Sequence, residues 1–148
     1  MAKQIDTIRF YPANDHYGEF SNFAKYPIYL RGKEWPTSEH YFQAQKFSGS
    51  EHEETIRKAK SAYLAAKLGR TLGPLPKDWN EQRIDVMYEA VRAKFIQHPE
   101  LRNLLLATGD ATLIEHTAKD HFWADGGDGK GQNWLGKILM NVRVELRD

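Results

Sequence analysis

The pattern of apolar positions is clearest in the second half of the chain, where it has the spacing of helices. Residues 78–98 carry an apolar side chain every three or four positions, and so does the segment after Asn133. Side chains at this spacing share one face of a helix, so both segments are predicted to be amphipathic helices. The apolar positions are Ile84, Met87, Tyr88, Val91 and Phe95 in the first segment, and Leu135, Ile138, Leu139, Val142 and Leu146 in the second.

Shorter helices are predicted from the residues that start and end them. Pro36 suits the first turn of a helix over 37–47, because its missing N–H is not needed there. Further helices are predicted to start near Glu51, after the capping residue Ser61, and at Pro99.

Strand signals are few and lie mainly near the start of the chain. Residues 7–11 (TIRFY) predict a short strand, and PIYLRGKEW predicts a hairpin with Arg31, Gly32 and Lys33 at its turn. ATLIEHT (111–117) fits either a strand or a helical turn. We therefore predict one α+β domain over 1–148, mostly helical, with a small antiparallel sheet from the N-terminal third. Strands and helices do not alternate, so a doubly wound parallel sheet is not expected.

Composition and charge narrow the function classes. The 148 residues include 21 basic and 20 acidic side chains, a net charge of +1, and no cysteine. The absence of cysteine excludes disulfides, thiolate nucleophiles and cysteine-ligated metals. The balanced charge is not that of a polybasic protein that binds nucleic acid or a membrane surface. Without a secretory signal or an apolar run of roughly 20 residues, we expect a cytoplasmic protein with no membrane partner.

One carboxylate, Glu39, stands out at the start of the predicted helix 37–47. At about 100° per residue it shares a helix face with Phe42, Gln43 and Lys46. Burial among the aromatic residues of this segment would raise the pKa of the Glu39 carboxyl and suit it to proton transfer near neutral pH. Alternatively, Glu39 is an ordinary first-turn acid that complements the helix dipole, worth about 0.3–1 kcal/mol.

A second group of acidic residues, Asp120, Asp125 and Asp128, lies around Trp123. Cleavage at a sugar carbon passes through an oxocarbenium-like transition state, and two carboxylates are the commonest means of stabilising it and transferring protons. Glu39 and one of these aspartates would supply such a pair. The alternative is a solvent-exposed turn, in which Asp and Gly are ordinary residues.

Glycines cluster at 126–131, just before the last predicted helix. The backbone N–H groups of such a loop, together with a helix N-terminus and Lys130, can bind an anion. Arg9 and Arg70 are further candidate phosphate partners, although a single arginine is more often a plain surface residue. The loop is neither a P-loop nor a dinucleotide-binding fingerprint.

Tryptophans and histidines each allow two interpretations. Trp79 and Trp123 can stack on a heterocyclic base, although packing is the more common role of such residues. His40 and His116 each stand beside a glutamate and are interpreted as structural. With no H-E-x-x-H pair and no cysteine, no metal site is expected.

Longer segments together resemble a known family. They are FYPANDHYGEFSNFAKYPI, WPTSEHYFQAQKF, LGR, LLLATGDATLIEHT and DHFWADGGDGKGQNWLGKILMNVR. In order and spacing they resemble the YbiA/NADAR family over nearly the whole chain. Ala124 stands where the family commonly has glycine.

The resemblance implies a hydrolase that acts on N-glycosyl compounds. YbiA-type members hydrolyse the C1′–N bond of phosphoribosylated aminopyrimidine intermediates of riboflavin biosynthesis and release ribose 5-phosphate. Related members remove ADP-ribose from guanine in nucleic acid. The implied partner is a small phosphoribosyl substrate, with nucleic acid only under the second activity, and no cofactor is implied.

The resemblance also implies site residues at the matching motif positions. Glu39 is implied as the acid/base or oxocarbenium-stabilising group, with Asp120 or Asp125 as a second catalytic carboxylate. The residues implied to bind substrate, through phosphate, ribose hydroxyls or base, are Asn22, Lys46, Arg70, Trp79, Trp123, Gly126 and Asn133.

Two non-enzymatic interpretations remain beside the hydrolase. One is a non-catalytic binder of ADP-ribose or an NAD-like ligand, in which Glu39→Gln would leave ligand affinity intact. The other is a partner-binding module that uses the exposed face of helix 51–60, although the charges there are typical of an ordinary solvent-exposed face.

Overall fold

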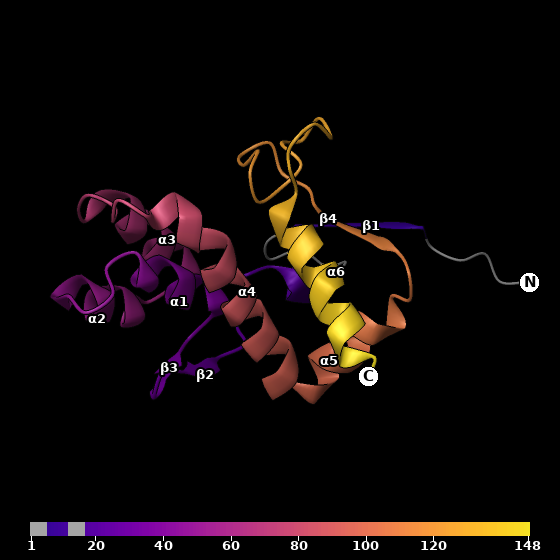
Figure 1. Cartoon of the computed structure of the whole chain (residues 1–148), viewed down its shortest axis with the longest axis horizontal. Helices are drawn as coiled ribbons and strands as arrows, with labels where there is room; N and C mark the ends of the chain where they lie inside the picture. The colour runs from indigo at the N-terminus through magenta and orange to yellow at the C-terminus, as the bar shows by residue number, and fades with distance from the viewer. Residues whose placement is uncertain (1–5, 12–16) are drawn as a thin grey trace, which may run out of the picture. The chain divides into compact units, whose positions relative to one another are not determined.

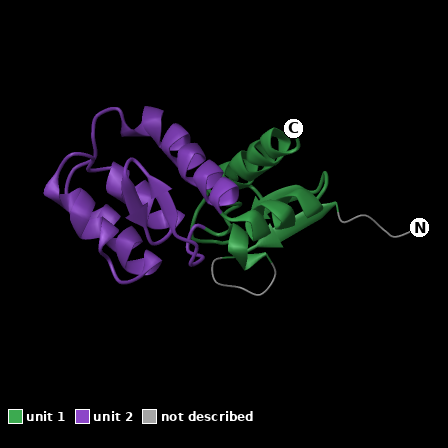
Figure 2. Ribbon diagram, turned by 90° about the horizontal axis from the view of Figure 1, so that it is seen from below, with its two compact units in different colours: residues 1–21, 98–148 green, residues 22–97 purple. Residues whose placement is uncertain are grey.

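The computed structural model of the chain describes residues 6–11 and 17–148. Figure 2 shows two compact units, unit 1 from residues 1–21 and 98–148 and unit 2 from residues 22–97. Unit 2 is therefore continuous in sequence, whereas unit 1 is built from two separate segments. The prediction of one domain over 1–148 stays a prediction, and each unit is described by itself.

Unit 2 is built around helix α1 (Ser38–Gln45), in which every residue is buried. It contacts α2 (Glu51–Arg57), α3 (Ala62–Thr71) and α4 (Trp79–Gln97), and Figure 1 shows these helices around it. Thr37 is the N-cap of the helix, and its side chain accepts a hydrogen bond from the backbone N–H of His40. Pro36 therefore precedes the helix and does not lie in its first turn, where the sequence placed it. Polar side chains on α1 are thus held inside the unit, where hydrogen-bonding partners must come from the protein or from a ligand.

The predicted hairpin is confirmed in unit 2. Strand β2 (Ile28–Leu30) pairs antiparallel with β3 (Lys33–Trp35), with Ile28 opposite Trp35. Arg31 and Gly32 form the turn, and both have positive φ values, 54° and 76°. Lys33, which the sequence also placed at the turn, is the first residue of β3. Glycine adopts this conformation without steric cost, which explains its place in the turn.

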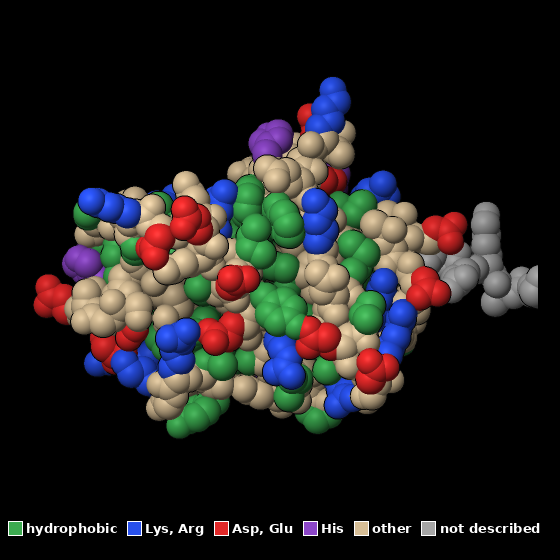
Figure 3. Space-filling model, in the orientation of Figure 1, with side chains coloured by type: hydrophobic (Ala, Val, Ile, Leu, Met, Phe, Trp, Pro, Cys, Tyr) green, Lys and Arg blue, Asp and Glu red, His purple; other side chains and the backbone are tan. Residues whose placement is uncertain are grey.

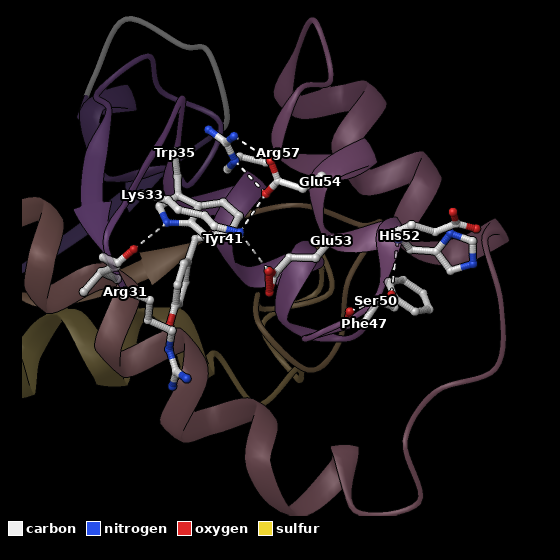
Figure 4. Close-up of polar contacts among 12 residues, drawn as sticks. Arg31, Lys33, Trp35, Tyr41, Phe47, Ser50, His52, Glu53, Glu54 and Arg57 are labelled. Atoms are coloured by element: carbon white, nitrogen blue, oxygen red, sulfur yellow. Dashed lines mark hydrogen bonds and ion pairs between the residues drawn. The ribbon is translucent and has the colours of Figure 1, made fainter.

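An ion pair from Lys33 connects the hairpin to α2, and a second pair, within α2, joins Arg57 to the same glutamate. Figure 4 shows Lys33 and Arg57 directed at Glu54, with N–O distances of 2.9 Å and 2.6 Å. The hydrogen bonds from Arg57 and Lys33 lower the pKa of Glu54 to about 2. Because these side chains are partly exposed, the Lys33–Glu54 pair orients the hairpin more than it stabilises it.

Unit 1 contains a pairing that the sequence did not predict. Strand β1 (Thr7–Phe10) pairs in parallel with β4 (Thr112–Glu115), with Ile8 opposite Leu113. The ambiguous segment 111–117 is therefore a strand, and β1 is not part of the antiparallel hairpin sheet. The α+β class with a small antiparallel sheet is confirmed, and this two-stranded parallel sheet is added to it.

The helices of unit 1 agree with the apolar pattern. Helix α5 (Pro99–Ala107) has proline at its start, and α6 (Trp134–Leu146) buries all five residues of its predicted stripe. A 3-10 helix, η1 (Gly18–Phe20), follows β1 in the chain, and residues 12–16 lie outside the described part.

The charges on the surface and the lengths of the helices bear on which classes of partner the protein could bind. On the face drawn in Figure 3, acidic and basic side chains are interspersed. Among the described residues, no helix combines the length and the apolar character that crossing a bilayer requires.

Candidate functional site

Glu39 lies in the first turn of α1 and is 7% exposed. Its backbone N–H donates to the carbonyl oxygen of Asn22 at 3.2 Å, so the segment around Asn22 crosses the start of the helix. Near a helix N-terminus, the backbone dipole favours the ionised carboxylate, while burial disfavours it. The carboxylate is thus held in a mostly desolvated place, as the catalytic interpretation requires.

Asn22 fixes this segment through its side chain as well. Its Oδ1 accepts a 2.7 Å hydrogen bond from the Ser38 hydroxyl, and its Nδ2 lies 3.2 Å from the sulfur of Met87. Asn22 is 6% exposed. These contacts give it a role in holding the start of α1, and its assignment as a substrate-binding residue stays a prediction.

Gln43 lies one turn beyond Glu39 on α1 and is buried beside it. Its Nε2 donates to Glu39 Oε2 at 3.4 Å, a long hydrogen bond. Its Oε1 is buried without a hydrogen-bond partner among the described residues. A Cβ placed on Gly69 of α3 would overlap this oxygen and lie 2.7 Å from Gln43 Cδ. Glycine at position 69 therefore makes room for the amide next to the carboxylate.

Lys46 and Arg70 bring positive charge to the same part of unit 2. Burial lowers the pKa of the Lys46 ammonium, the charge of Arg70 lowers it further, and the charge of Glu39 raises it. The Lys46 nitrogen also lies 5.7 Å from the centre of the Phe42 ring. A lysine with a lowered pKa can exchange a proton or act as an amine nucleophile more readily than a surface lysine.

Trp79 begins α4 and packs on α1, the helix that carries Glu39 and Phe42. Its ring centre lies 5.3 Å from that of Phe42, and the residue is 4% exposed. Packing therefore accounts for most of its surface, and stacking on a base stays a prediction for Trp79.

In unit 1, Asp120 closes a turn of the acidic loop. Its Oδ1 accepts hydrogen bonds of 2.8 Å from the backbone N–H groups of Phe122 and Trp123, and its carbonyl oxygen accepts one from Gly126 at 3.0 Å. Gly126 has φ 74°, a conformation that favours glycine. The rings of Phe122 and Trp123 then meet edge to face, 4.8 Å apart. These contacts favour the turn interpretation of Asp120.

Asp125 is held more firmly, at 4% exposure. Its Oδ1 accepts from the backbone N–H groups of Thr117 at 3.2 Å and Gly127 at 2.8 Å, while Oδ2 lies 2.6 Å from His116 Nδ1. Burial alone would raise the pKa of Asp125, but the hydrogen bonds from His116, Gly127 and Thr117 outweigh it and lower the pKa. Asp125 is therefore an ionised, fully engaged carboxylate.

Asn133 joins the end of this loop to β4. It has φ 54°, its Oδ1 accepts from the Glu115 N–H at 3.0 Å, and its Nδ2 donates to the Leu113 carbonyl at 2.9 Å. A Cβ on Gly136 would overlap both the Asn133 amide and the Leu113 carbonyl oxygen. The amide of Asn133 is used within unit 1, and its predicted contact with ribose hydroxyls or phosphate stays a prediction.

The histidine beside Glu39 has a structural environment. His40 is 1% exposed, with Nδ1 2.8 Å from the Thr37 hydroxyl and Nε2 3.0 Å from the Ala59 carbonyl. Burial lowers the pKa of His40, so the ring is neutral and donates from Nε2. Residues 6–11 and 17–148 contain no group of three or more His, Asp or Glu side chains arranged to hold a metal ion.

The predicted site residues thus form two groups. Asn22, Glu39, Lys46, Arg70 and Trp79 belong to unit 2. The acidic-loop residues Asp120, Trp123, Asp125, Gly126 and Asn133 belong to unit 1.

The sequence analysis gave no site role to three residues: Gln43, which contacts Glu39, Gly69, which lies against Gln43, and His116, which contacts Asp125. Gln43 does share the helix face of Glu39, and a glycine inside the predicted helix containing Gly69 is a packing signal. No local signal distinguishes His116, because its partner Asp125 lies across a loop.

The chain is similar to known proteins over almost its whole length. The chain is 55% identical over 144 residues to N-glycosidase YbiA of Escherichia coli. The match covers 97% of this chain and 90% of the relative. It is 46% identical over 142 residues, 95% of this chain and 39% of the relative, to a riboflavin biosynthesis protein of Vibrio vulnificus. The NMR structure of E. coli YbiA superposes with a TM-score of 0.90 at 53% identity, covering 99% of this chain and 88% of that one.

These similarities confirm the predicted reaction class, a hydrolase acting on N-glycosyl compounds. They also bear out the fold class and the family resemblance. The NADAR domain matches residues 9–147, and the chain belongs to the NADAR family.

Proposed function

We propose that this protein hydrolyses the C1′–N bond of phosphoribosylated aminopyrimidine intermediates of riboflavin biosynthesis and releases ribose 5-phosphate. The names of relatives support the reaction class, and two relatives named riboflavin biosynthesis proteins support the substrate class. The observation that carries the proposal is the buried carboxylate of Glu39 with the Lys46 and Arg70 cations in its surroundings.

The chemistry follows from where charge develops. As the C1′–N bond breaks, its electron pair goes to the departing nitrogen and C1′ becomes positively charged. A carboxylate fixed in a site of low dielectric stabilises that charge far better than one in water. Water then adds to C1′, one of its protons is lost, and the departing amine gains a proton. No metal or redox cofactor takes part in this proposal.

The cations fit the other end of the substrate. Lys46 directly follows the last residue of α1, and Arg70 lies in the neighbouring helix α3. A ribose phosphate carries the negative charge that two such cations attract. Arg70 is exposed, so its side chain can reach a ligand. Phosphate binding would position C1′, and remote binding energy of this kind lowers the barrier of the chemical step.

The acidic loop of unit 1 matches motif positions of the family as well. We retain Asp120, Asp125, Trp123, Gly126 and Asn133 as proposed site residues. Their observed contacts favour support of the loop over direct bond breaking for Asp120, Asp125 and Asn133. A cytoplasmic location and a small-molecule partner belong to the same proposal.

The test compares two substrates and two carboxylate variants. Wild type, Glu39→Gln and the control Glu34→Gln, which changes an exposed carboxylate, are incubated with a phosphoribosylaminopyrimidine and with an oligonucleotide carrying ADP-ribosylated guanine. Released sugar is quantified. We expect release from the pyrimidine by wild type and Glu34→Gln, and a loss of about 10²–10⁴-fold in Glu39→Gln.

The other outcomes are equally informative. Release from the oligonucleotide alone would assign the protein to removal of ADP-ribose from guanine. Binding of ADP-ribose without turnover of either substrate would point to a non-catalytic binder. Equal turnover by Glu39→Gln and Glu34→Gln would remove Glu39 from the mechanism.

A further inference from the structure

We propose that Gln43 is a positioning residue for the N-glycosidase reaction, whose side-chain amide orients the Glu39 carboxylate. This inference rests on the proposed function and deepens it. Gln43 acts through Glu39 and takes no part in bond breaking itself. Both residues, and the glycine that makes room for the amide, belong to unit 2.

The first observation is the direction of the Gln43 amide. Glu39 stabilises a positive C1′ only as an anion, and an ionised carboxylate can accept hydrogen bonds but cannot donate them. The amide nitrogen of Gln43 must therefore face the carboxylate, and Nε2 does donate to Glu39 Oε2 at 3.4 Å. The distance is long, as hydrogen bonds of catalytic groups often are before a substrate binds.

The second observation is what this orientation leaves behind. With Nε2 towards Glu39, Oε1 of Gln43 is buried and has no hydrogen-bond partner among the described residues. A buried acceptor of this kind has lost the hydrogen bond to water that it makes in the unfolded chain, so it destabilises the fold. An apolar side chain of similar shape would avoid this loss.

The third observation is that α3 lacks a side chain where it meets the same amide. Gly69 lies inside α3, where glycine is less favourable than alanine. A Cβ at this position would overlap Oε1 of Gln43 and lie 2.7 Å from its Cδ. An unpartnered oxygen and a glycine within a helix thus occur at one contact. Such local departures from the most stable choice are expected where a fold supports a functional group.

Gln45 separates these features from one another. It is also a glutamine of α1, is also 8% exposed, and also has a buried amide atom, Nε2, without a hydrogen-bond partner among the described residues. At about 100° per residue, however, it points to the opposite side of α1 from Gln43. An unpartnered amide atom is therefore not specific to Gln43, whereas the contact with Glu39 and the space left by Gly69 are.

The arrangement suits the proposed reaction. Positive charge develops at C1′ in the transition state, and an anion whose orientation is already fixed stabilises it without reorganising. The Glu39 side chain has several rotatable bonds, and a hydrogen bond to Oε2 restricts its carboxylate before substrate arrives. Gln43 thereby lowers the barrier without touching the substrate.

The test uses Gln43→Met, which keeps the length of the side chain but removes its hydrogen-bonding groups. Gln45→Met is the matched control. Urea unfolding measures stability, and kcat and KM are measured on whichever N-glycosyl substrate wild type cleaves. Glu39→Gln and the double variant Glu39→Gln/Gln43→Met complete a cycle that measures the coupling between the two residues.

We expect Gln43→Met to be at least as stable as wild type, because the unpartnered oxygen is gone. Its kcat should fall by up to about 10²-fold with KM little changed, whereas Gln45→Met should keep the wild-type kcat. In the Glu39→Gln background, Gln43→Met should lower kcat no further, because the amide acts only through the carboxylate. A residue needed only for packing would lower stability and would have the same effect in both backgrounds.

A second measurement needs no change at position 43. In NMR spectra, the side-chain amide signals of Gln43 should shift in Glu39→Gln, whereas those of Gln45 should stay in place. Unchanged Gln43 signals would show that its amide is not bound to the carboxylate and would overturn the inference.

The outcomes also separate this inference from the proposed function. Wild-type kcat in folded Gln43→Met, beside an impaired Glu39→Gln, would overturn the role of Gln43 alone. Full activity of Glu39→Gln would remove both residues from the mechanism. A wild type that cleaves the guanine oligonucleotide but not the pyrimidine would defeat the proposed substrate while leaving the Gln43 test intact. A wild type that cleaves neither defeats both.

Discussion

The side-chain amide of Gln43 occupies the space that a Cβ on Gly69 would need. The close approach of α1 and α3 thus depends on a missing methyl group, and the amide that it admits lies 3.4 Å from the Glu39 carboxylate. The packing between these two helices therefore also determines which group lies beside the proposed catalytic carboxylate.

Gly69→Ala should destabilise the protein and lower turnover. Alanine gains up to about 1 kcal/mol over glycine in a helix, but overpacking a core costs about 1–3 kcal/mol. We expect the packing cost to prevail, with the displaced Gln43 amide disturbing Glu39. The control is Gly73→Ala, since a Cβ there would meet Phe47 at an ordinary 3.8 Å. Urea unfolding and turnover measure both effects, and a more stable Gly69→Ala protein would contradict the prediction.

Lys46 should make stability depend on alkaline pH. Burial, with Arg70, lowers the folded-state pKa of Lys46 below its ordinary 10.5. Between the two pKa values the unfolded chain binds the extra proton, so the free energy of unfolding rises with pH in that window. The penalty of the buried charge is fully present below the folded pKa.

The measurement compares wild type with Lys46→Met between pH 8 and 10, where carboxylates are ionised. Wild type should gain stability relative to Lys46→Met as pH rises. The control is Lys67→Met, which changes an exposed lysine of α3. Its stability should change with pH in the same way as that of wild type. Parallel curves for wild type and Lys46→Met would show that Lys46 titrates normally.

Tyr41→Phe should lower the free energy of unfolding by about 1 kcal/mol. The variant should also lose less stability at high pH than wild type does. The buried hydroxyl donates to Glu89 and accepts a 2.8 Å hydrogen bond from Arg31. Burial and the Glu89 hydrogen bond raise the pKa of Tyr41 above its ordinary 10.0. Above pH 10 the unfolded chain loses the tyrosine proton and the folded protein keeps it, so wild-type stability falls as pH rises.

Guanidinium unfolding at pH 9 and 11 measures this slope for wild type, Tyr41→Phe and the control Tyr63→Phe. Tyr63 is 68% exposed. Only Tyr41→Phe should show a smaller fall in stability between the two pH values. An equal fall in all three proteins would mean that other groups cause it.

Asn133 should be replaced less harmfully by glycine than by alanine. Either change loses the two side-chain hydrogen bonds to Glu115 N–H and the Leu113 carbonyl, each worth about 0.5–1.5 kcal/mol. Alanine must in addition adopt φ 54°, at a further cost of about 1–2 kcal/mol. Denaturant midpoints of both variants test this order, and equal midpoints would mean that the backbone relaxes.

Sequence reasoning succeeded where the determining contacts are local. Ser61 caps its helix within one turn, and the Arg31–Gly32 turn joins strands that are neighbours in the chain. The apolar stripe of α6 depends only on helical periodicity. Such features are visible in a short window of residues.

It failed where the partner lies far along the chain. β1 and β4 are each short, and nothing in either shows that they pair in parallel. The same limit applies to the site, because the position of Glu39 follows from helix phase whereas the contacts of Gln43 with Gly69 and of Asp125 with His116 need the folded chain. The roles of the predicted site residues stay predictions.

The pairing of β1 with β4 has a consequence for the order in which the protein is made. During synthesis β1 emerges first, yet its partner strand follows only after all of unit 2. Unit 2, whose contacts come from one continuous segment, can form while β1 still has an unpaired edge, and such edges invite pairing with other chains. Slow translation of residues 98–148 would prolong that exposure, so a pulse-labelled ribosome-bound chain should aggregate most at lengths just short of β4.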